Sequence, residues 1–360
     1  MTKMTNAKIN STLNTTPNAN ANIKSFIKSL YRLYRPKSFG EVVGQEYVTK
    51  TLINQIANDK IGHAYLFCGT RGTGKTSVAK IFADAINCQN FTDGKVCGQC
   101  EWCKNPNKSM DVIEIDAASN NGVEPVRDLI DAVKYPPVVG RYKVYIIDEV
   151  HMFSNNAFNA LLKTLEEPPP HIVFILATTT PQKLLPTVQS RCLRFDFRNV
   201  TVADIVKVIK SIFAKEKISA DEDAMEEIAR EGNGSVRDAL SFADMVTQYC
   251  ADEKITVAAI NKITGAVNEM VLKNLVAAIV NKEIAQITKL CGEIFDKCNN
   301  TNRVLADYLR VLKNAYIATP TDKIANALKI FMDLEMNIKN SVNGAEHFET
   351  AALVASAYGG

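Results

Sequence analysis

The stretch that decides the fold is Gly69-Thr70-Arg71-Gly72-Thr73-Gly74-Lys75-Thr76, a full match to the phosphate-binding pattern G-x-x-x-x-G-K-[ST]. A short apolar run, Ala64-Tyr65-Leu66-Phe67, leads straight into it, and Thr76 to Ile86 has the pattern of a helix. This order of strand, loop and helix is the structural context that the motif requires. The sequence therefore predicts a P-loop nucleotide-binding site.

A P-loop holds phosphate because its backbone N–H groups and the N-terminus of the following helix form a cradle for anions. Lys75 is expected to neutralise the β- and γ-phosphates, and the Thr76 hydroxyl is expected to coordinate magnesium. The other nucleotide-binding residues predicted in this stretch are Gly69, Gly72, Thr73, Gly74 and Ser77. ATP and Mg²⁺ are thus the expected cofactors.

A second apolar run, Val144-Tyr145-Ile146-Ile147, ends in an acidic pair. Asp148 stands at the strand end, where it could hold the magnesium through water, and Glu149 could orient and activate the attacking water. Acidic residues after a strand are often only turn formers. The apolar run in a chain that also has a P-loop favours the catalytic interpretation, so the sequence predicts ATP hydrolysis as well as binding.

Four cysteines lie between these two motifs with the spacing C-x8-C-x2-C-x2-C: Cys88, Cys97, Cys100 and Cys103. Their positions follow no helical or strand period that would bury them as free thiols, and glycines interrupt the segment. A tetrahedral Zn²⁺ held by all four thiolates is the predicted arrangement. Because this ligand set is closed, the metal is expected to be structural, with Trp102 packed inside the knuckle.

The composition is that of an ordinary globular protein. The 360 residues are enough for two or three domains, and 46% are hydrophobic while 22% are charged. A net charge of +3 is too small to indicate nucleic-acid binding through a global field, so DNA contacts must depend on locally placed lysines and arginines. No apolar run approaches the length that spans a bilayer, and no membrane association is expected.

The N-terminal segment and the cysteine count indicate the compartment. The first 22 residues contain six asparagines and five threonines without a continuous apolar stretch, which predicts a disordered tail over residues 1–22 and not a secretory signal. Nine cysteines in a chain without an export signal indicate a reducing compartment, where a tight cysteine cluster binds metal. The sequence therefore predicts a cytoplasmic protein.

Alternating elements predict an α/β fold with a parallel sheet covered on both faces. Helices are expected over Gln45–Asn58 and Asn155–Glu166. Further strands are expected over Val112–Asp116, Lys143–Ile147, Ile172–Ala177 and Leu193–Phe197.

Beyond Phe197 the strand patterns end and helices are expected almost throughout, with breaks at 218–219, 232–234, 299–301, 319–320 and 343–344. The predicted domains are an ATPase domain over 23–198 with the zinc insert at 88–103, a small helical domain over 199–264, and an all-helical domain over 265–360.

A set of short stretches surrounds these motifs. Its members are Tyr34-Arg35-Pro36, Val42-Val43-Gly44-Gln45, His63-Ala64-Tyr65-Leu66-Phe67, Glu114-Ile115-Asp116-Ala117-Ala118-Ser119, Asp148-Glu149-Val150-His151-Met152, Asn159-Ala160-Leu161-Leu162-Lys163-Thr164-Leu165-Glu166-Glu167-Pro168, Pro181-Gln182-Lys183-Leu184 and Ser190-Arg191-Cys192. They closely resemble the gamma/tau subunit family of the bacterial DNA polymerase III clamp loader. The resemblance, dense over 31–245, implies an AAA+ ATPase module, a lid domain, and a collar domain that holds a hetero-pentameric ring together.

The resemblance also implies roles that the residues alone do not reveal. Thr179, otherwise a strand-end hydroxyl, matches the position that senses the γ-phosphate. Arg191, otherwise a surface arginine, matches the arginine finger that acts catalytically on ATP bound by the neighbouring subunit. Arg237 matches the lid arginine that reaches the phosphates. Lys163 and Lys183 match positions that face DNA, although a solvated lysine accounts for each equally well. The adenine-pocket wall is implied to comprise Arg35, Pro36, Val42, Val43 and Val236.

The function implied by this resemblance is an ATP-driven motor subunit that loads the sliding clamp onto primed DNA. The implied partners are the delta and delta-prime subunits, the clamp, primer–template DNA and the polymerase core. Two alternatives stay open: a non-hydrolysing stator like delta-prime, which the intact P-loop and acidic pair disfavour, and a branch-migration helicase motor, which the zinc insert disfavours. The end at Gly360, without the long extension of the tau form, is expected of a gamma-type product or a truncated chain.

Overall fold

The computed structural model describes residues 29–251, 253–265, 267, 269–296, 298, 300–337 and 343–357, apart from the side chains of residues 106 and 109. They form two compact units, Met1–Ala251 and Asp252–Gly360. The predicted disordered tail at 1–22 lies outside the described residues. The first unit joins the predicted ATPase domain to most of the second predicted domain, and the bounds 23–198, 199–264 and 265–360 stay predictions.

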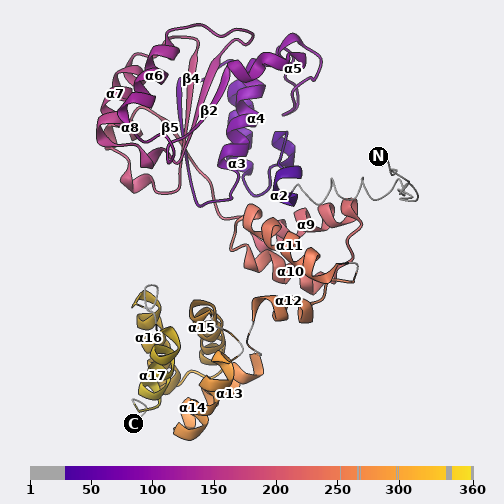
Figure 1. Cartoon of the computed structure of the whole chain (residues 1–360), viewed down its shortest axis with the longest axis vertical. Coiled ribbons are helices and arrows are strands. Elements are labelled where there is room, and N and C mark those ends of the chain that lie inside the picture. The colour runs from indigo at the N-terminus through magenta and orange to yellow at the C-terminus, as the bar shows by residue number, and fades with distance from the viewer. Residues whose placement is uncertain are drawn as a thin grey trace, which may run out of the picture. The chain divides into compact units, whose positions relative to one another are not determined.

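A five-stranded parallel sheet forms the centre of the first unit (Figure 1). Its order is β2-β3-β4-β1-β5, so the strand that leads into the P-loop lies between β4 and β5. The strands are β1 (Ala64–Cys68), β2 (Val112–Asp116), β3 (Lys143–Asp148), β4 (Ile172–Thr178) and β5 (Leu193–Asp196). The predicted α/β class and parallel sheet are confirmed, and each strand lies within one residue of its predicted bounds.

Helices cover both faces of this sheet, which explains the continuous apolar character of its central strands. Tyr65 and Phe67 pack on the side of α3 (Glu46–Ala57) and α4 (Lys75–Asn87). The alternate residues Leu66 and Cys68 pack on the opposite side, beneath α6 (Val123–Val133), α7 (Asn155–Glu166) and α8 (Pro186–Gln189). The short elements between them are η1 (Phe39–Glu41), α5 (Glu101–Lys104), η2 (Pro106–Met110), η3 (Val150–Met152) and η4 (Pro181–Lys183).

Three helices complete the first unit: α9 (Val202–Glu216), α10 (Glu222–Glu231) and α11 (Val236–Cys250). The short helix α2 (Leu30–Leu33) is attached to them, because the Leu30 amide donates to Asp244 at 2.8 Å and the Tyr34 hydroxyl donates to Glu216 at 2.6 Å. The segment after residue 29 therefore links the helical layer to the start of the α/β layer.

The elements of the second unit are all α-helices among the residues described. An aromatic cluster forms its centre, where the ring centroids of Tyr308 and Phe331 lie 4.7 Å apart and those of Phe331 and Phe348 lie 5.0 Å apart. Its helices are α12 (Val257–Thr264), α13 (Glu269–Asn281), α14 (Ile284–Phe295), α15 (Thr301–Ala318), α16 (Asp322–Asn337) and α17 (Gly344–Ala357). Among the residues described, no single helix is both long and apolar enough to cross a membrane, and the bent pair α12–α13 passes that test only when its two helices are taken together.

Candidate nucleotide-binding site

Two glycines give the P-loop its path. Gly69 has φ +149°, and a Cβ there would lie 2.5 Å from the Phe197 carbonyl oxygen. Gly72 has φ +76°, and a Cβ there would lie 1.8 Å from the Ser235 hydroxyl oxygen at the start of α11. Each of these positions combines a positive φ with a lack of space for a Cβ atom, one beside the end of the sheet and one beside α11. Only glycine meets both requirements.

Lys75 is folded back onto the loop. Its Nζ donates to the carbonyl oxygens of Gly69 and Thr70, both at 2.8 Å, and the residue is only 5% exposed. Burial lowers the pKa of Lys75, while the nearby charges of Glu149 and Asp148 oppose that shift. The ammonium group is therefore satisfied by backbone oxygens that phosphate oxygens could replace.

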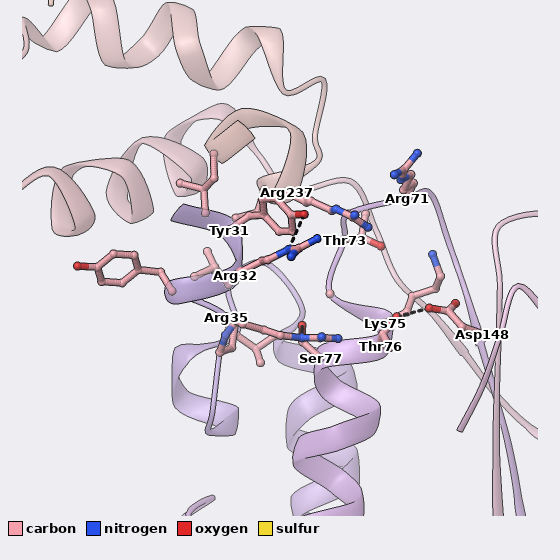
Figure 2. A pocket seen from close by; sticks show the side chains of 18 of the residues that line it. Tyr31, Arg32, Arg35, Arg71, Thr73, Lys75, Thr76, Ser77, Asp148 and Arg237 are labelled. Atoms are coloured by element: carbon pink, nitrogen blue, oxygen red, sulfur yellow. Dashed lines mark hydrogen bonds between the residues drawn. The ribbon is translucent and has the colours of Figure 1, made fainter. Parts of the chain in front are cut away.

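Thr76 and Asp148 meet at the carboxyl edge of the sheet. The Thr76 hydroxyl donates to Asp148 Oδ2 at 2.7 Å, as the dashed line in Figure 2 shows. Hydroxyl and carboxylate oxygens are the donor types that Mg²⁺ prefers. Parallel strands bring the two residues together although they lie 72 positions apart in the sequence. The residues present therefore fit a magnesium ion beside the P-loop.

Glu149 follows Asp148 and adopts a backbone conformation that is rare outside glycine, with φ +48°. Its Oε2 accepts a hydrogen bond from the Thr179 hydroxyl at 3.0 Å and lies 3.3 Å from Nδ1 of His151. Thr179, just beyond β4, is thus adjacent to the predicted catalytic carboxylate, whereas its predicted phosphate contact stays a prediction. Backbone strain of this kind persists where surrounding contacts enforce it.

A cavity of about 870 Å³ encloses these groups, within the range of roughly 300–1,000 Å³ typical of small-molecule sites. Most of the predicted nucleotide-site residues line it: Arg35, Pro36, Val42, Val43, Gly72, Thr73, Gly74, Lys75, Thr76, Ser77, Asp148, Glu149, Val236 and Arg237. Gly69 and Thr179 lie just outside the lining, although Gly69 accepts from Lys75 and Thr179 donates to Glu149. The sheet, α2 and α11 thus bring distant segments together at one cavity.

Among the residues that line the cavity, Tyr31, Arg32 and Arg71 were not predicted from the sequence. Figure 2 shows Tyr31 beside Arg237, which with Arg35 is one of two predicted arginines that reach toward the P-loop. The Arg237 guanidinium lies 4.9 Å from the Tyr31 ring centre, and Arg32 Nε donates to the Tyr31 hydroxyl at 2.9 Å. The hydrogen bond from Arg32 is the main cause that lowers the pKa of Tyr31. Arg71, at the tip of the P-loop, also lines the cavity.

Gln45 is a further residue whose role the sequence did not reveal. It is 3% exposed, and its amide donates to the carbonyl oxygens of Thr73 at 3.3 Å and Arg198 at 2.7 Å. Its Oε1 accepts from the Arg198 amide at 3.1 Å. Gln45 therefore connects the P-loop to the segment after β5 through its side-chain amide. In the sequence it is only a polar residue before an amphipathic helix, which is a weak signal.

The structure does not bring Arg191, Lys163 or Lys183 to the cavity. Arg191 donates to Glu166 at 2.5 Å and to the Thr187 carbonyl oxygen at 2.7 Å. Lys163 on α7 and Lys183 on η4 are exposed. Their predicted roles toward a neighbouring subunit and toward DNA stay predictions, since the structure holds a single chain.

The four cysteines form a separate cluster. Their Sγ atoms all lie within 4.8 Å of one another, and Cys103 Sγ lies 3.9 Å from Cys97 and 3.8 Å from Cys88. A tetrahedral Zn²⁺ with bonds of about 2.3 Å requires sulfur–sulfur distances of about 3.8 Å. Amides of Gln99 and Cys100 donate to Cys97 Sγ and lower its pKa to about 6. The cluster therefore fits zinc, and Trp102, 2% exposed, packs against it as predicted.

Comparison with known proteins gives two matching family models. One, described as "DNA polymerase III, delta subunit", matches residues 44–201. The other, described as "DNA polymerase III clamp loader subunit, ATPase lid domain", matches residues 204–251. Both matches lie within the first unit.

Similar curated proteins include DNA polymerase III subunit tau of Bacillus subtilis, 47% identical over 284 residues that cover 78% of this chain and 50% of that protein. The tau subunit of Escherichia coli is 42% identical over 285 residues that cover 79% of this chain and 44% of that protein. The chain spans about half the length of these relatives.

Among solved structures, the RuvB Holliday junction branch migration motor of Thermotoga maritima matches with a TM-score of 0.51 and 20% identity, covering 72% of this chain and 85% of that one. At this low sequence identity, the match is evidence for a similar fold and for nothing more. The shared part is the fold, which in this chain is a parallel α/β sheet with a P-loop, followed by helices.

Proposed function

Since the chain belongs to the family of DNA polymerase III tau and gamma subunits, we propose that it is an ATP-hydrolysing motor subunit of a clamp loader. Its proposed task is to use ATP binding and hydrolysis to place a sliding clamp on primed DNA. The observation that carries this proposal is the complete set of phosphate, magnesium and water-activating groups around one cavity: Lys75, Thr76, Asp148 and Glu149.

The proposed mechanism begins with an exchange of partners. Lys75 would give up the carbonyl oxygens of Gly69 and Thr70 for phosphate oxygens, which replaces neutral acceptors by charged ones. Arg237 and Arg35 would add cationic groups from α11 and from the segment after α2. The N-terminus of α4, which begins at Lys75, would favour the same anion.

Thr76 and Asp148 would hold Mg²⁺, which supplies positive charge against the phosphate oxygens. Glu149 would orient the attacking water and accept its proton, and Thr179 would fix that carboxylate through the 3.0 Å hydrogen bond. Arg191 would act across a subunit interface, so it must first leave Glu166 for the phosphates of a neighbouring site. The Zn²⁺ that the four cysteines fit would serve folding, since no open ligand position is left.

The proposed partners follow from the family. They are delta and delta-prime subunits, the sliding clamp, primer–template DNA and the polymerase core, in a hetero-pentameric ring in the cytoplasm. We place the ring contacts on the helices beyond residue 265 and a DNA-facing role on Lys163 and Lys183, whose exposure supports this.

The test is steady-state ATP hydrolysis by the chain alone and after addition of partner subunits, clamp and primed DNA. The proposal expects slow hydrolysis alone and strong stimulation by the complete set. Nucleotide binding without hydrolysis in any combination would favour a stator like delta-prime. Strand displacement without clamp loading would favour a branch-migration motor.

A further inference from the structure

His151 lies on η3, two residues beyond the proposed catalytic glutamate. Its side chain is only 9% exposed. Its Nδ1 lies between two oxygens, 3.3 Å from Glu149 Oε2 and 3.0 Å from the Thr178 hydroxyl at the end of β4. No role was assigned to His151 from the sequence, and nothing described so far requires a histidine at this position.

The hydrogen-bond partners determine which atom carries the proton. An ionised carboxylate can only accept hydrogen bonds, so Nδ1 stabilises Glu149 only if Nδ1 carries a hydrogen. The Thr178 oxygen already accepts from the Thr180 amide at 3.1 Å and keeps a second lone pair, so it tolerates the same N–H. A hydrogen on Nδ1 therefore suits both neighbouring oxygens, that of Thr178 and that of Glu149.

Glu149 is held on one side only. Its Oε2 receives the Thr179 hydroxyl at 3.0 Å in addition to the His151 contact, and its backbone amide donates to Asp148 Oδ1 at 2.9 Å. Of the residues that the structure describes, none donates to Oε1. The left-handed backbone at φ +48° fixes where the side chain begins, and the Thr179 hydrogen bond together with the His151 contact restrains one carboxylate oxygen. The other oxygen is left available.

We propose that His151 is a positioning residue for Glu149, which together with Thr179 holds Oε2 so that Oε1 can take the attacking water. This inference rests on the proposed ATPase function. A carboxylate with only Thr179 as a donor can rotate about its last bond, which is a broad torsion with a low barrier. Small losses of alignment at a reacting group can lower a rate by about 10²-fold.

The principal test compares His151→Leu with His151→Asn in the full chain, assembled with its partner subunits, clamp and primed DNA. Leucine fills a similar volume without a donor, whereas the asparagine amide nitrogen occupies the place of Nδ1. We expect His151→Leu to lower kcat by about 10- to 100-fold with nucleotide affinity unchanged, and His151→Asn to recover most of the rate. An unchanged or increased kcat for His151→Leu would overturn the inference, as would equal loss in both variants.

A double-mutant cycle separates positioning from a general structural role. In a Glu149→Gln background the proposed base is already absent, so adding His151→Leu should change the residual rate by less than about twofold. A further loss as large as in the unmodified chain would mean that His151 acts independently of Glu149. If the His151→Leu variant fails to bind nucleotide, a His151→Gln variant takes its place in the comparison. The glutamine amide lies near the position of Nε2 and not of Nδ1, so His151→Gln should be slow where His151→Asn is fast. Full hydrolysis by Glu149→Gln alone would instead refute the proposed function, which keeps the two failures distinct.

Discussion

The cysteine cluster and the nucleotide cavity are both fitted to metal ions, yet they hold their ligand groups in opposite ways. The cluster draws all four sulfurs from residues 88–103, and backbone amides support the sulfurs in place. The cavity draws its groups from segments that lie up to about two hundred positions apart, from α2 to α11. The first site is local and closed, whereas the second depends on the whole first unit.

The two sites also differ in the partners that their polar groups have. In the cavity, Lys75 is bound to carbonyl oxygens, Thr76 to Asp148, and Thr179 to Glu149. The contacts of Lys75 and Thr76 could be exchanged for contacts with a bound nucleotide and its metal ion, whereas the contact between Thr179 and Glu149 would persist. In the cluster, a bound Zn²⁺ would offset the mutual repulsion of four thiolates held at short range. The comparison shows that the local cluster is suited to stabilising the fold, whereas the cavity is suited to binding and releasing a ligand.

Removing one cysteine should have the largest effect, because structural zinc contributes on the order of 10 kcal/mol or more to local folding. We expect Cys100→Ser to lose zinc and to unfold the 88–103 segment while nucleotide still binds at Lys75. Metal analysis and hydrogen exchange measure both parts. Cys291→Ser, in α14 of the second unit, is the matched control and should keep one zinc per chain. Absence of zinc from the unmodified chain, purified without chelators, contradicts the assignment.

Removing Arg191 should abolish most ATP hydrolysis in an assembly and leave ATP binding almost unchanged. The reason is that an arginine acting in trans raises the rate of hydrolysis by a factor of about 10³–10⁵. The measurement is a mixture of Arg191→Ala chains with Lys75→Ala chains. Some interfaces then pair an intact P-loop with an intact arginine, and activity should partly return. Arg194→Ala, which breaks only the pair with Asp196, is the control and should hydrolyse normally. No recovery at any mixing ratio, with assembly verified, would assign Arg191 a structural role at Glu166.

Glu149→Gln should bind ATP normally and hydrolyse it about 10²–10⁴-fold more slowly, because the amide cannot accept the proton of the attacking water. Lys75→Ala should instead lose nucleotide binding. Equilibrium binding and single-turnover hydrolysis distinguish the two, with Glu167→Gln as an exposed control. If both variants bind and hydrolyse like the unmodified chain, the cavity is not the catalytic site.

Tyr31→Leu should have the smallest effect. A cation–π contact at an exposed position contributes about 0.5–1 kcal/mol, or roughly two- to fivefold in affinity. Loss of the ring under Arg237 should weaken nucleotide binding by that factor, measured by titration. Tyr31→Phe keeps the ring and should bind like the unmodified chain. Equal weakening in both variants would show that the hydroxyl held by Arg32 matters and the ring does not.

Local signals were sufficient for most of the fold. Helix α7 and strand β2 have their predicted bounds, because one apolar face and flanking polar residues mark each of them. The break between α13 and α14 was not predicted, since Lys282 ends the helix in a left-handed conformation, φ +61°, without a glycine or proline nearby. The Glu283 amide closes this end by donating to the Ala278 carbonyl oxygen at 3.0 Å.

The site was less accessible to sequence reasoning. Motif residues such as Lys75 and Asp148 carry their chemistry in the local pattern. Gln45 and Tyr31 belong to no such pattern, because their contacts lie far away in the sequence. Gln45 contacts Arg198 and Tyr31 contacts Arg237, each more than a hundred positions away. His151 was visible only as part of a motif. Its contact with Thr178 exists because β3 and β4 are neighbours in the sheet.

Gly72 leaves no room for a methyl group beside Ser235, so the P-loop and the start of α11 are in close contact. Interiors packed at this density respond to displacement by discrete shifts, so a movement of the loop by the width of a methyl group must be shared by the helix. Linkage then works in both directions: a partner that displaces α11 changes the affinity for nucleotide by the same factor by which nucleotide changes the affinity for that partner. Any molecule that binds α11 and shifts it would therefore change the nucleotide affinity of this chain without touching the P-loop.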